Sequence, residues 1–180
     1  MKKKISFITG IAVGFFLLTI SGVANALPLP TIEQGVIGAT DNLKGWAKLA
    51  NSGDDTELTW INTLVDPDYG GLVKTNSMIV DPNDSTKEIA NPDWKWYQVV
   101  DSAGKATGQY AFDFITDKPD YFLIKIGAGN AAYDHFLFEN IDSKEWGVIT
   151  LSLNLNEGAF EIKNYSALSH VDEVGGSTPI

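Results

Sequence analysis

Three consecutive runs between residues 121 and 154 have bulky apolar residues at every second position. The positions that share one face are Phe122, Ile124 and Ile126 in 121–126, Phe136 and Phe138 in 134–139, and Ile149, Leu151 and Leu153 in 148–154. Neighbouring residues of a strand point to opposite faces, and a period of two is too short for a helix. The three runs therefore predict the centre of an antiparallel sheet.

Further strand-like runs lie on both sides of this centre. They are 56–65, 72–80, 94–100, 109–115, the segment around Phe160 and Ile162, and 165–170. Turn-forming residues separate them, such as the Asp-Pro and Gly-Gly pairs of 66–71. Eight to nine strands at this spacing are typical of an antiparallel β-sandwich. We therefore predict an all-β fold with a single sandwich, jelly-roll-like in outline.

Two segments have a less regular pattern. In 41–50, Asp41 is a possible N-cap and Leu43 and Trp46 recur at near-helical spacing, but Gly45 weakens a helix. This segment is either a short helix or a first strand. Residues 81–93 are rich in carboxylates and contain two prolines, which predicts a long polar loop.

The N-terminus has the pattern of a secretory signal peptide. Three lysines precede an apolar run over 5–20, and Ala24-Asn25-Ala26 forms a small-residue cleavage site. The alternative is a membrane anchor, which the apolar run is nearly long enough to form. The expected organisation is a signal peptide over 1–26, the sandwich over 27–173 and a flexible spacer over 174–180. The mature protein is then secreted or held in the cell envelope.

Composition narrows the possible partners. Removal of the three leader lysines lowers the formal net charge from −10 to −13, which disfavours nucleic acid and anionic membrane surfaces as partners. The chain has no cysteine, so disulfides and thiolate metal sites are excluded. Only two histidines are present, His135 and His170, which argues against a histidine-rich catalytic metal site. We expect a monomer whose mature chain does not insert into a membrane.

Four stretches together resemble a known family: YFLIKIGAG, DHFLFENI, a tryptophan before VITLSLN, and SALSHVDEVGG. The resemblance is to exported bacterial proteins with a PEP-CTERM sorting signal, and it covers roughly residues 50–176. It implies a secreted β-sandwich that works in the envelope or extracellular matrix of a Gram-negative, polysaccharide-producing bacterium. It supplies no catalytic residue. The Pro-Glu-Pro motif, apolar helix and arginine cluster of that family would follow Ile180, where the sequence ends.

Carboxylates are concentrated in the predicted turns. Asp66 and Asp68 flank one proline, and Asp81 and Asp84 flank another. Calcium is bound by six to eight oxygens from flexible loops, and these residues are the candidate ligands. The segment from Asp66 begins like an EF-hand loop but has serine, not glutamate, at the twelfth position. The alternative is a solvated acidic surface, with no cofactor.

Exposed aromatic residues could bind a sugar. Trp94 and Trp96 fall on one face of a predicted strand and Tyr69 lies in a turn, so flat rings could stack on pyranose faces beside carboxylates. These three are the candidate ligand-binding residues. The alternative is that the tryptophans belong to the core, where burial removes a large apolar area from water.

No catalytic group stands out. Ser169, His170 and Asp172 cannot form a triad on one strand, because neighbours point to opposite faces. Carboxylate pairs for glycoside hydrolysis would come from Glu57, Glu139, Glu145, Glu157 or Glu161, which sequence spacing cannot pair. We therefore expect a non-catalytic module that recognises extracellular polysaccharide or has a structural role. The alternative is a hydrolase of polysaccharide or peptidoglycan.

Overall fold

The computed structural model describes residues 29–50, 53–66, 68–127, 131–141, 145–155, 158–162 and 167–176. Its elements are Thr31–Glu33 (β1), Gln34–Ile37 (α1), Asn42–Ala47 (β2), Asp54–Asn62 (α2), Val73–Asn76 (β3), Met78–Asp81 (β4), Asp84–Ala90 (β5), Trp96–Val100 (β6), Ala106–Asp113 (β7), Tyr121–Ile126 (β8), His135–Glu139 (β9), Trp146–Thr150 (β10), Ser152–Leu155 (β11), Gly158–Glu161 (β12) and Leu168–Val174 (β13). The predicted all-β class is confirmed. The predicted signal peptide and residues 177–180 of the spacer lie outside the described residues. Among the described helices, none has the length and apolar character needed to cross a membrane.

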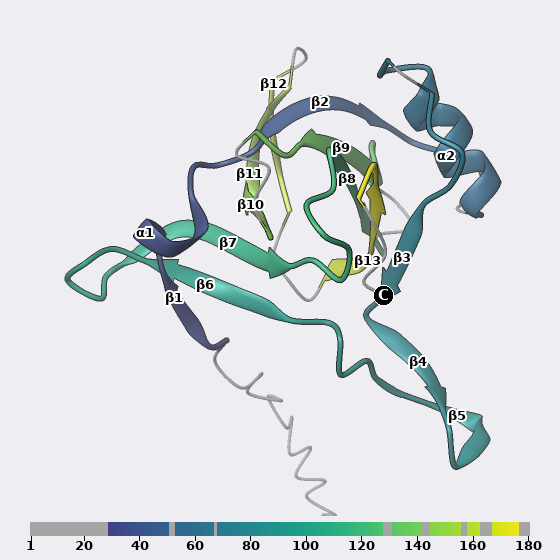
Figure 1. Cartoon of the computed structure of the whole chain (residues 1–180), viewed down its shortest axis with the longest axis horizontal. Coiled ribbons are helices and arrows are strands. Elements are labelled where there is room, and N and C mark those ends of the chain that lie inside the picture. Colours follow the sequence, from purple (N-terminus) through teal and green to yellow (C-terminus); the bar gives the residue numbers. More distant parts are fainter. Residues whose placement is uncertain are drawn as a thin grey trace, which may run out of the picture.

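Two sheets form the body of the fold (Figure 1). One has the strand order β1-β6-β7-β10 and the other β2-β9-β8-β13-β3. Every pairing within them is antiparallel except that of β1 with β6. The main core contains buried side chains of both sheets, among them Phe112 and Ile149 of the first and Phe122, Phe136 and Val171 of the second. The two sheets therefore pack face to face as a sandwich.

Each sheet also has an apolar outer face that a short helix covers. On the four-stranded sheet, Ile37 of α1 packs with Val99 and Val148. On the five-stranded sheet, Ile61 of α2 packs with Leu123 and Leu137. The alternation predicted for 121–126 and 134–139 is thus confirmed, because phenylalanines at 122, 136 and 138 face the main core while Leu123 and Leu137 face α2.

The strand predicted over 56–65 is wrong, because this segment contains the helix α2. Its first turn holds Asp54, Asp55 and Glu57, and acidic groups there interact favourably with the helix dipole. Glu57 and Ile61 are four residues apart and both are buried, as expected for one face of a helix. The segment 41–50, which allowed either a helix or a strand, forms β2.

The predicted polar loop over 81–93 is also wrong in part, because β5 occupies most of it. β4 and β5 form a hairpin that extends away from the two main sheets (Figure 1). Val80 and Ile89 of this hairpin remain exposed, so the strands have no buried face to impose an alternating pattern. Polar composition therefore indicated a loop where the backbone is extended.

The last predicted strand, over 165–170, overlaps β13, which begins at Leu168. β13 pairs with β8 on one side and β3 on the other, so it lies inside the five-stranded sheet. His170, Asp172 and Glu173 are all buried there. Glu173 accepts hydrogen bonds from the backbone N–H groups of Ile115 and Thr116 and from the Thr116 hydroxyl. β13 also continues to Val174, one residue beyond the predicted domain end.

Close packing of the two sheets at Gly147 allows a test of the core. A Cβ atom added at this position would lie 2.7 Å from Cζ of Phe114 and 3.1 Å from Cζ of Phe122. Gly147→Ala should therefore lower the free energy of unfolding by about 1–3 kcal/mol, as overpacking does in other cores. Urea denaturation measures this loss. The matched control is Gly35→Ala, where no atom lies within 4 Å and the stability should not fall. Equal stability of the two variants would contradict this packing.

Candidate functional site

A cluster of buried ionisable residues lies between α2 and the five-stranded sheet. His170 of β13 pairs with Lys125 of β8, and Lys125 pairs with His135 of β9, so the three residues form one row across the sheet. In β9 and β13, residues at alternate positions share a face. His135 and His170 therefore point to the side of the sheet that α2 covers.

Asp172 and Lys74 occupy the adjoining positions of the same face, because they are directly paired between β13 and β3. The helix α2 then places the side chain of Glu57 over them. We refer to Glu57, Lys74, His135, His170 and Asp172 as the Glu57 cluster. It draws its members from one helix and three strands.

Both carboxylate oxygens of Glu57 accept hydrogen bonds. Oε1 lies 3.0 Å from Nε2 of His135 and 3.0 Å from Nε2 of His170. Oε2 accepts a hydrogen bond of 2.5 Å from Nζ of Lys74. The Glu57 side chain is 0% exposed. This one carboxylate therefore ties α2 to β9, β13 and β3.

Other carboxylates surround the basic members of the cluster. Nζ of Lys74 is also 2.7 Å from Oδ1 of Asp54, an exposed residue of α2, and 3.7 Å from Oδ1 of Asp172. Nδ1 of His135 lies 2.6 Å from Oδ1 of Asp134, which also accepts a hydrogen bond from the backbone of Leu49. Both ring contacts of His135 are hydrogen bonds only when both nitrogens carry a proton.

The buried environment changes the ionisation of these groups. Burial acts to raise the pKa of Glu57, but hydrogen bonds from His135, His170 and Lys74 outweigh it and hold that pKa well below its usual range. Burial, together with the charge of Glu57, raises the pKa of Asp172 to about 8. Burial lowers the pKa of His170, although its hydrogen bond to Glu57 opposes the shift. Glu57 and Asp172 thus have opposite shifts in one cluster.

Asp172 is the least satisfied member of the cluster. Its side chain is 0% exposed, and neither carboxylate oxygen has a hydrogen-bond partner within the described residues. Single ligand atoms of Glu57, His170 and Asp172 lie within 4.8 Å of one another. Helix α2 closes the cluster against a large substrate, but the three residues offer donor atoms of the kind that metal ions bind.

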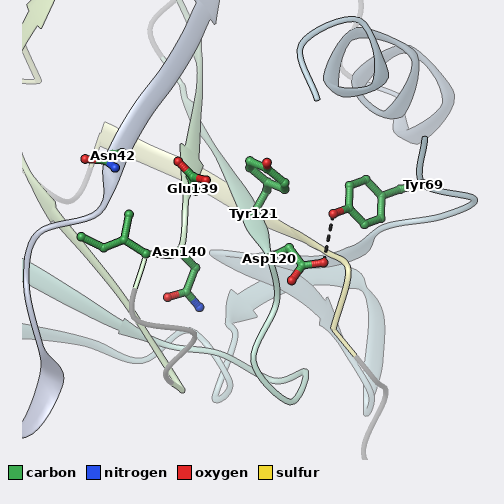
Figure 2. A pocket seen from close by; sticks show the side chains of 7 residues that line it. Asn42, Tyr69, Asp120, Tyr121, Glu139 and Asn140 are labelled. Atoms are coloured by element: carbon green, nitrogen blue, oxygen red, sulfur yellow. Dashed lines mark hydrogen bonds between the residues drawn. The ribbon is translucent and has the colours of Figure 1, made fainter. Parts of the chain in front are cut away.

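A second candidate site is open to solvent. It is a hollow of about 510 Å³ lined by Asn42, Tyr69, Asp120, Tyr121, Glu139, Asn140 and Ile141, which we call the tyrosine hollow (Figure 2). Its residues come from the start of β2, the segment after α2, the start of β8 and the end of β9. Tyr121 of β8 pairs directly with Glu139 of β9, so the sheet register brings these two lining residues together.

Tyr69 is held in the tyrosine hollow by contacts at both ends. Its backbone exchanges two hydrogen bonds with the side chain of Asn62, the last residue of α2. Its hydroxyl donates to Oδ2 of Asp120 at 2.9 Å, as Figure 2 shows. Its ring meets that of Tyr121 edge to face, with centroids 6.0 Å apart. Burial and the bond to Asp120 raise the pKa of Tyr69 to about 12, so its hydroxyl remains a donor.

The predicted tryptophan platform is wrong. Trp94 and Trp96 do lie side by side, with ring centroids 5.8 Å apart. However, Trp96 is 2% exposed and packs on Phe112 inside the main core. Trp94 is partly buried, and the two rings together line a small hollow of about 280 Å³ instead of an open platform. Of the three predicted ligand-binding residues, only Tyr69 lies in the tyrosine hollow.

The four predicted calcium ligands are not brought together. Asp66 and Asp68 are exposed in the segment after α2, whereas Asp81 and Asp84 lie at the turn of the β4–β5 hairpin. The second pair is engaged locally, since Asp81 accepts from the backbone of Asn83 and Asp84 pairs with a neighbouring lysine at 2.8 Å. Two separate pairs of carboxylates cannot supply the six oxygens that one calcium ion requires.

Sequence reasoning missed the Glu57 cluster. Glu57 and His170 are 113 positions apart in the sequence, and Glu57 was assigned to a strand. One signal was available, because the alternation of 134–139 places His135 opposite Phe136 and Phe138, on the same face as Leu137. A polar histidine beside a buried leucine indicates a buried hydrogen-bond partner.

No protein-family model, curated protein or solved structure matches this chain. The two candidate sites differ in their access to solvent. The Glu57 cluster lies beneath α2, and the tyrosine hollow opens at the surface beside the end of that helix.

Proposed function

We propose that the protein is a secreted or envelope-associated recognition module without catalytic activity, and that it binds extracellular polysaccharide in the tyrosine hollow. The observation that carries the proposal is the composition of this hollow. Two tyrosine rings lie beside two carboxylates and two amides, in a hollow within the 300–1,000 Å³ typical of ligand sites. Rings can cover the apolar face of a sugar, while carboxylate and amide groups can bond its hydroxyls.

The charge of the hollow favours neutral or amino sugars over acidic ones. Asp120 and Glu139 both line it, and the whole chain has a formal net charge of −10. Like charges brought together in a binding site are repelled. Polysaccharides rich in uronic acid or sulfate should therefore bind weakly.

The same two carboxylates give less support to the alternative function, hydrolysis of polysaccharide or peptidoglycan, than to binding. Asp120 accepts a hydrogen bond from the hydroxyl of Tyr69, and Glu139 is paired with Lys44 at 3.2 Å. Glycoside hydrolysis requires a carboxyl group that is free to protonate the leaving group. Each of these two carboxylates is instead engaged by a neighbouring side chain.

Binding is tested by affinity electrophoresis and calorimetry with neutral, amino-sugar and uronic-acid polysaccharides. Asp120→Ala should weaken binding of the preferred class at least about ten-fold, which corresponds to about 1.4 kcal/mol. The matched control is Asp93→Ala, an exposed residue outside the hollow, which should leave binding unchanged. Equal binding by both variants would place the ligand elsewhere. Release of reducing ends that is lost in Glu139→Gln would show that the protein is a hydrolase.

A further inference from the structure

Three donor atoms of the Glu57 cluster, one each from Glu57, His170 and Asp172, lie within 4.8 Å of one another. Nε2 of His170 lies 3.0 Å from Oε1 of Glu57 and 3.5 Å from Oδ2 of Asp172. Ligand atoms about 2.0–2.1 Å from a tetrahedral Zn²⁺ ion are about 3.3–3.4 Å apart. The two distances from His170 therefore lie on either side of this ligand spacing.

Asp172 provides an independent indication of a missing partner. A buried carboxyl group without hydrogen bonds is costly, and neither oxygen of Asp172 has a hydrogen-bond partner among the described residues. Lys74 and His170 approach these oxygens only at 3.7 and 3.5 Å. A cation seated between Asp172, Glu57 and His170 would supply the interaction that Asp172 lacks.

The orientation of the neighbouring groups also suits a metal. Carboxylate ligands of metal ions are usually hydrogen-bonded in turn by outer groups. Here Oε1 of Glu57 accepts from His135, whose other ring nitrogen contacts Asp134 at 2.6 Å. This chain of contacts fixes the Glu57 carboxylate in place before any ion arrives.

Lys74 carries a positive charge that would compete with a metal ion for the carboxylates of the cluster. Its ammonium group lies 2.5 Å from Glu57 and 2.7 Å from Asp54, whose side chain is 66% exposed. If a divalent ion entered, repulsion would move the ammonium outward, where Asp54 would still pair with it. The Lys74 side chain is itself 15% exposed, so the cluster is in contact with solvent at this residue.

We propose that Glu57, His170 and Asp172 bind a divalent transition-metal ion of the Zn²⁺ type, and that the ammonium group of Lys74 competes with the ion for this site. One imidazole and two carboxylates suit zinc and its neighbours, whereas calcium would need six or more oxygens. The site is separate from the tyrosine hollow and does not depend on polysaccharide binding.

The test is calorimetric titration of the EDTA-treated mature protein with Zn²⁺ alone, at mildly alkaline pH because the ligands must be deprotonated. The wild type should bind one ion per chain, and Lys74→Met should bind it at least about ten-fold more tightly because the competitor is gone. Asp172→Asn and His170→Gln should each lose this binding. Asp84→Asn, a matched change in the exposed hairpin, should retain it. Ca²⁺ should not replace Zn²⁺ in any variant.

Two outcomes would overturn the proposal. One is unchanged zinc affinity in both Asp172→Asn and His170→Gln, and the other is affinity in Lys74→Met no higher than in the wild type. A gain of affinity cannot arise from misfolding, so the lysine variant remains decisive even if the others unfold. X-ray absorption of the zinc-loaded wild type gives a second measurement, in which one imidazole in the coordination shell is expected. A shell without imidazole would place the ion elsewhere.

Discussion

Glu57→Ala is expected to lower the free energy of unfolding by about 3–5 kcal/mol, the usual cost of removing one partner from a buried ion pair. The substitution leaves His135 and His170 facing a space from which their shared acceptor oxygen has gone. It also removes the 2.5 Å contact of the Lys74 ammonium with Glu57, while the 2.7 Å contact with Asp54 is kept. The helix α2 would lose its polar attachment to three strands at once. Urea denaturation measures the loss.

Two further variants separate this effect from a general effect of losing a glutamate. Glu88→Ala removes an exposed glutamate from the outer hairpin and should change stability by no more than about 0.5 kcal/mol. Glu57→Gln keeps the side-chain size and one acceptor oxygen. It should therefore lose less stability than Glu57→Ala and more than Glu88→Ala. A loss below about 1 kcal/mol in Glu57→Ala would mean that the cluster does not hold α2 on the sheet.

Asp172→Asn is expected to become more stable relative to the wild type as the pH rises from about 4 to about 8. In the folded protein the pKa of Asp172 is raised from 3.8 to about 8, so the folded state keeps a proton that the unfolded chain releases. The wild type therefore loses stability as the pH rises through this window. Asparagine has no proton to release. The difference in free energy of unfolding between the two proteins should grow by several kcal/mol, on the order expected for a pKa shift of this size.

This comparison isolates Asp172 because the other groups titrate in both proteins. The lowered pKa of Glu57 contributes stability that is lost as the pH falls below about 4.5, and the lowered pKa of His170 causes a loss below about 6.5. Both losses of stability occur as the pH falls, and they occur in the wild type and in Asp172→Asn alike. The measurement is urea denaturation across pH in the presence of EDTA. If the difference in free energy of unfolding between the two proteins did not change with pH, Asp172 would ionise in the folded state as it does in the unfolded chain.

Local periodicity predicted the strands of the sheet centre because both faces of those strands are buried by regular packing. Phe122 and Leu123 point into two different apolar layers, and Phe122, Ile124 and Ile126 recur at every second position on the face that meets the main core. The same reasoning failed for α2, where Leu58 and Trp60 alternate by chance. It failed again for β5, which has no buried face. The residue pattern of a segment predicts its secondary structure only where packing decides which of its positions are buried.

The candidate sites could be predicted less well than the strands. Tyr69 was identified as a ligand-binding residue for its exposed ring, but its neighbours Asp120 and Glu139 are brought to it by the pairing of β8 with β9 and the end of α2. For Trp96 the sequence allowed either a ligand-binding position or a place in the core. The structure buries it because inward and outward positions along β6 depend on which sheet covers that strand.

By itself the sequence determined the all-β class, the faces of the central strands and the acidic charge of the chain, because each of these follows from residue type and local spacing. Only the tertiary structure decided that Glu57, His170 and Asp172 meet, and that Tyr69 faces Asp120. Such contacts join residues far apart in the chain, and they exist because sheet register and the docking of α2 bring them together. Local spacing carries no information about either.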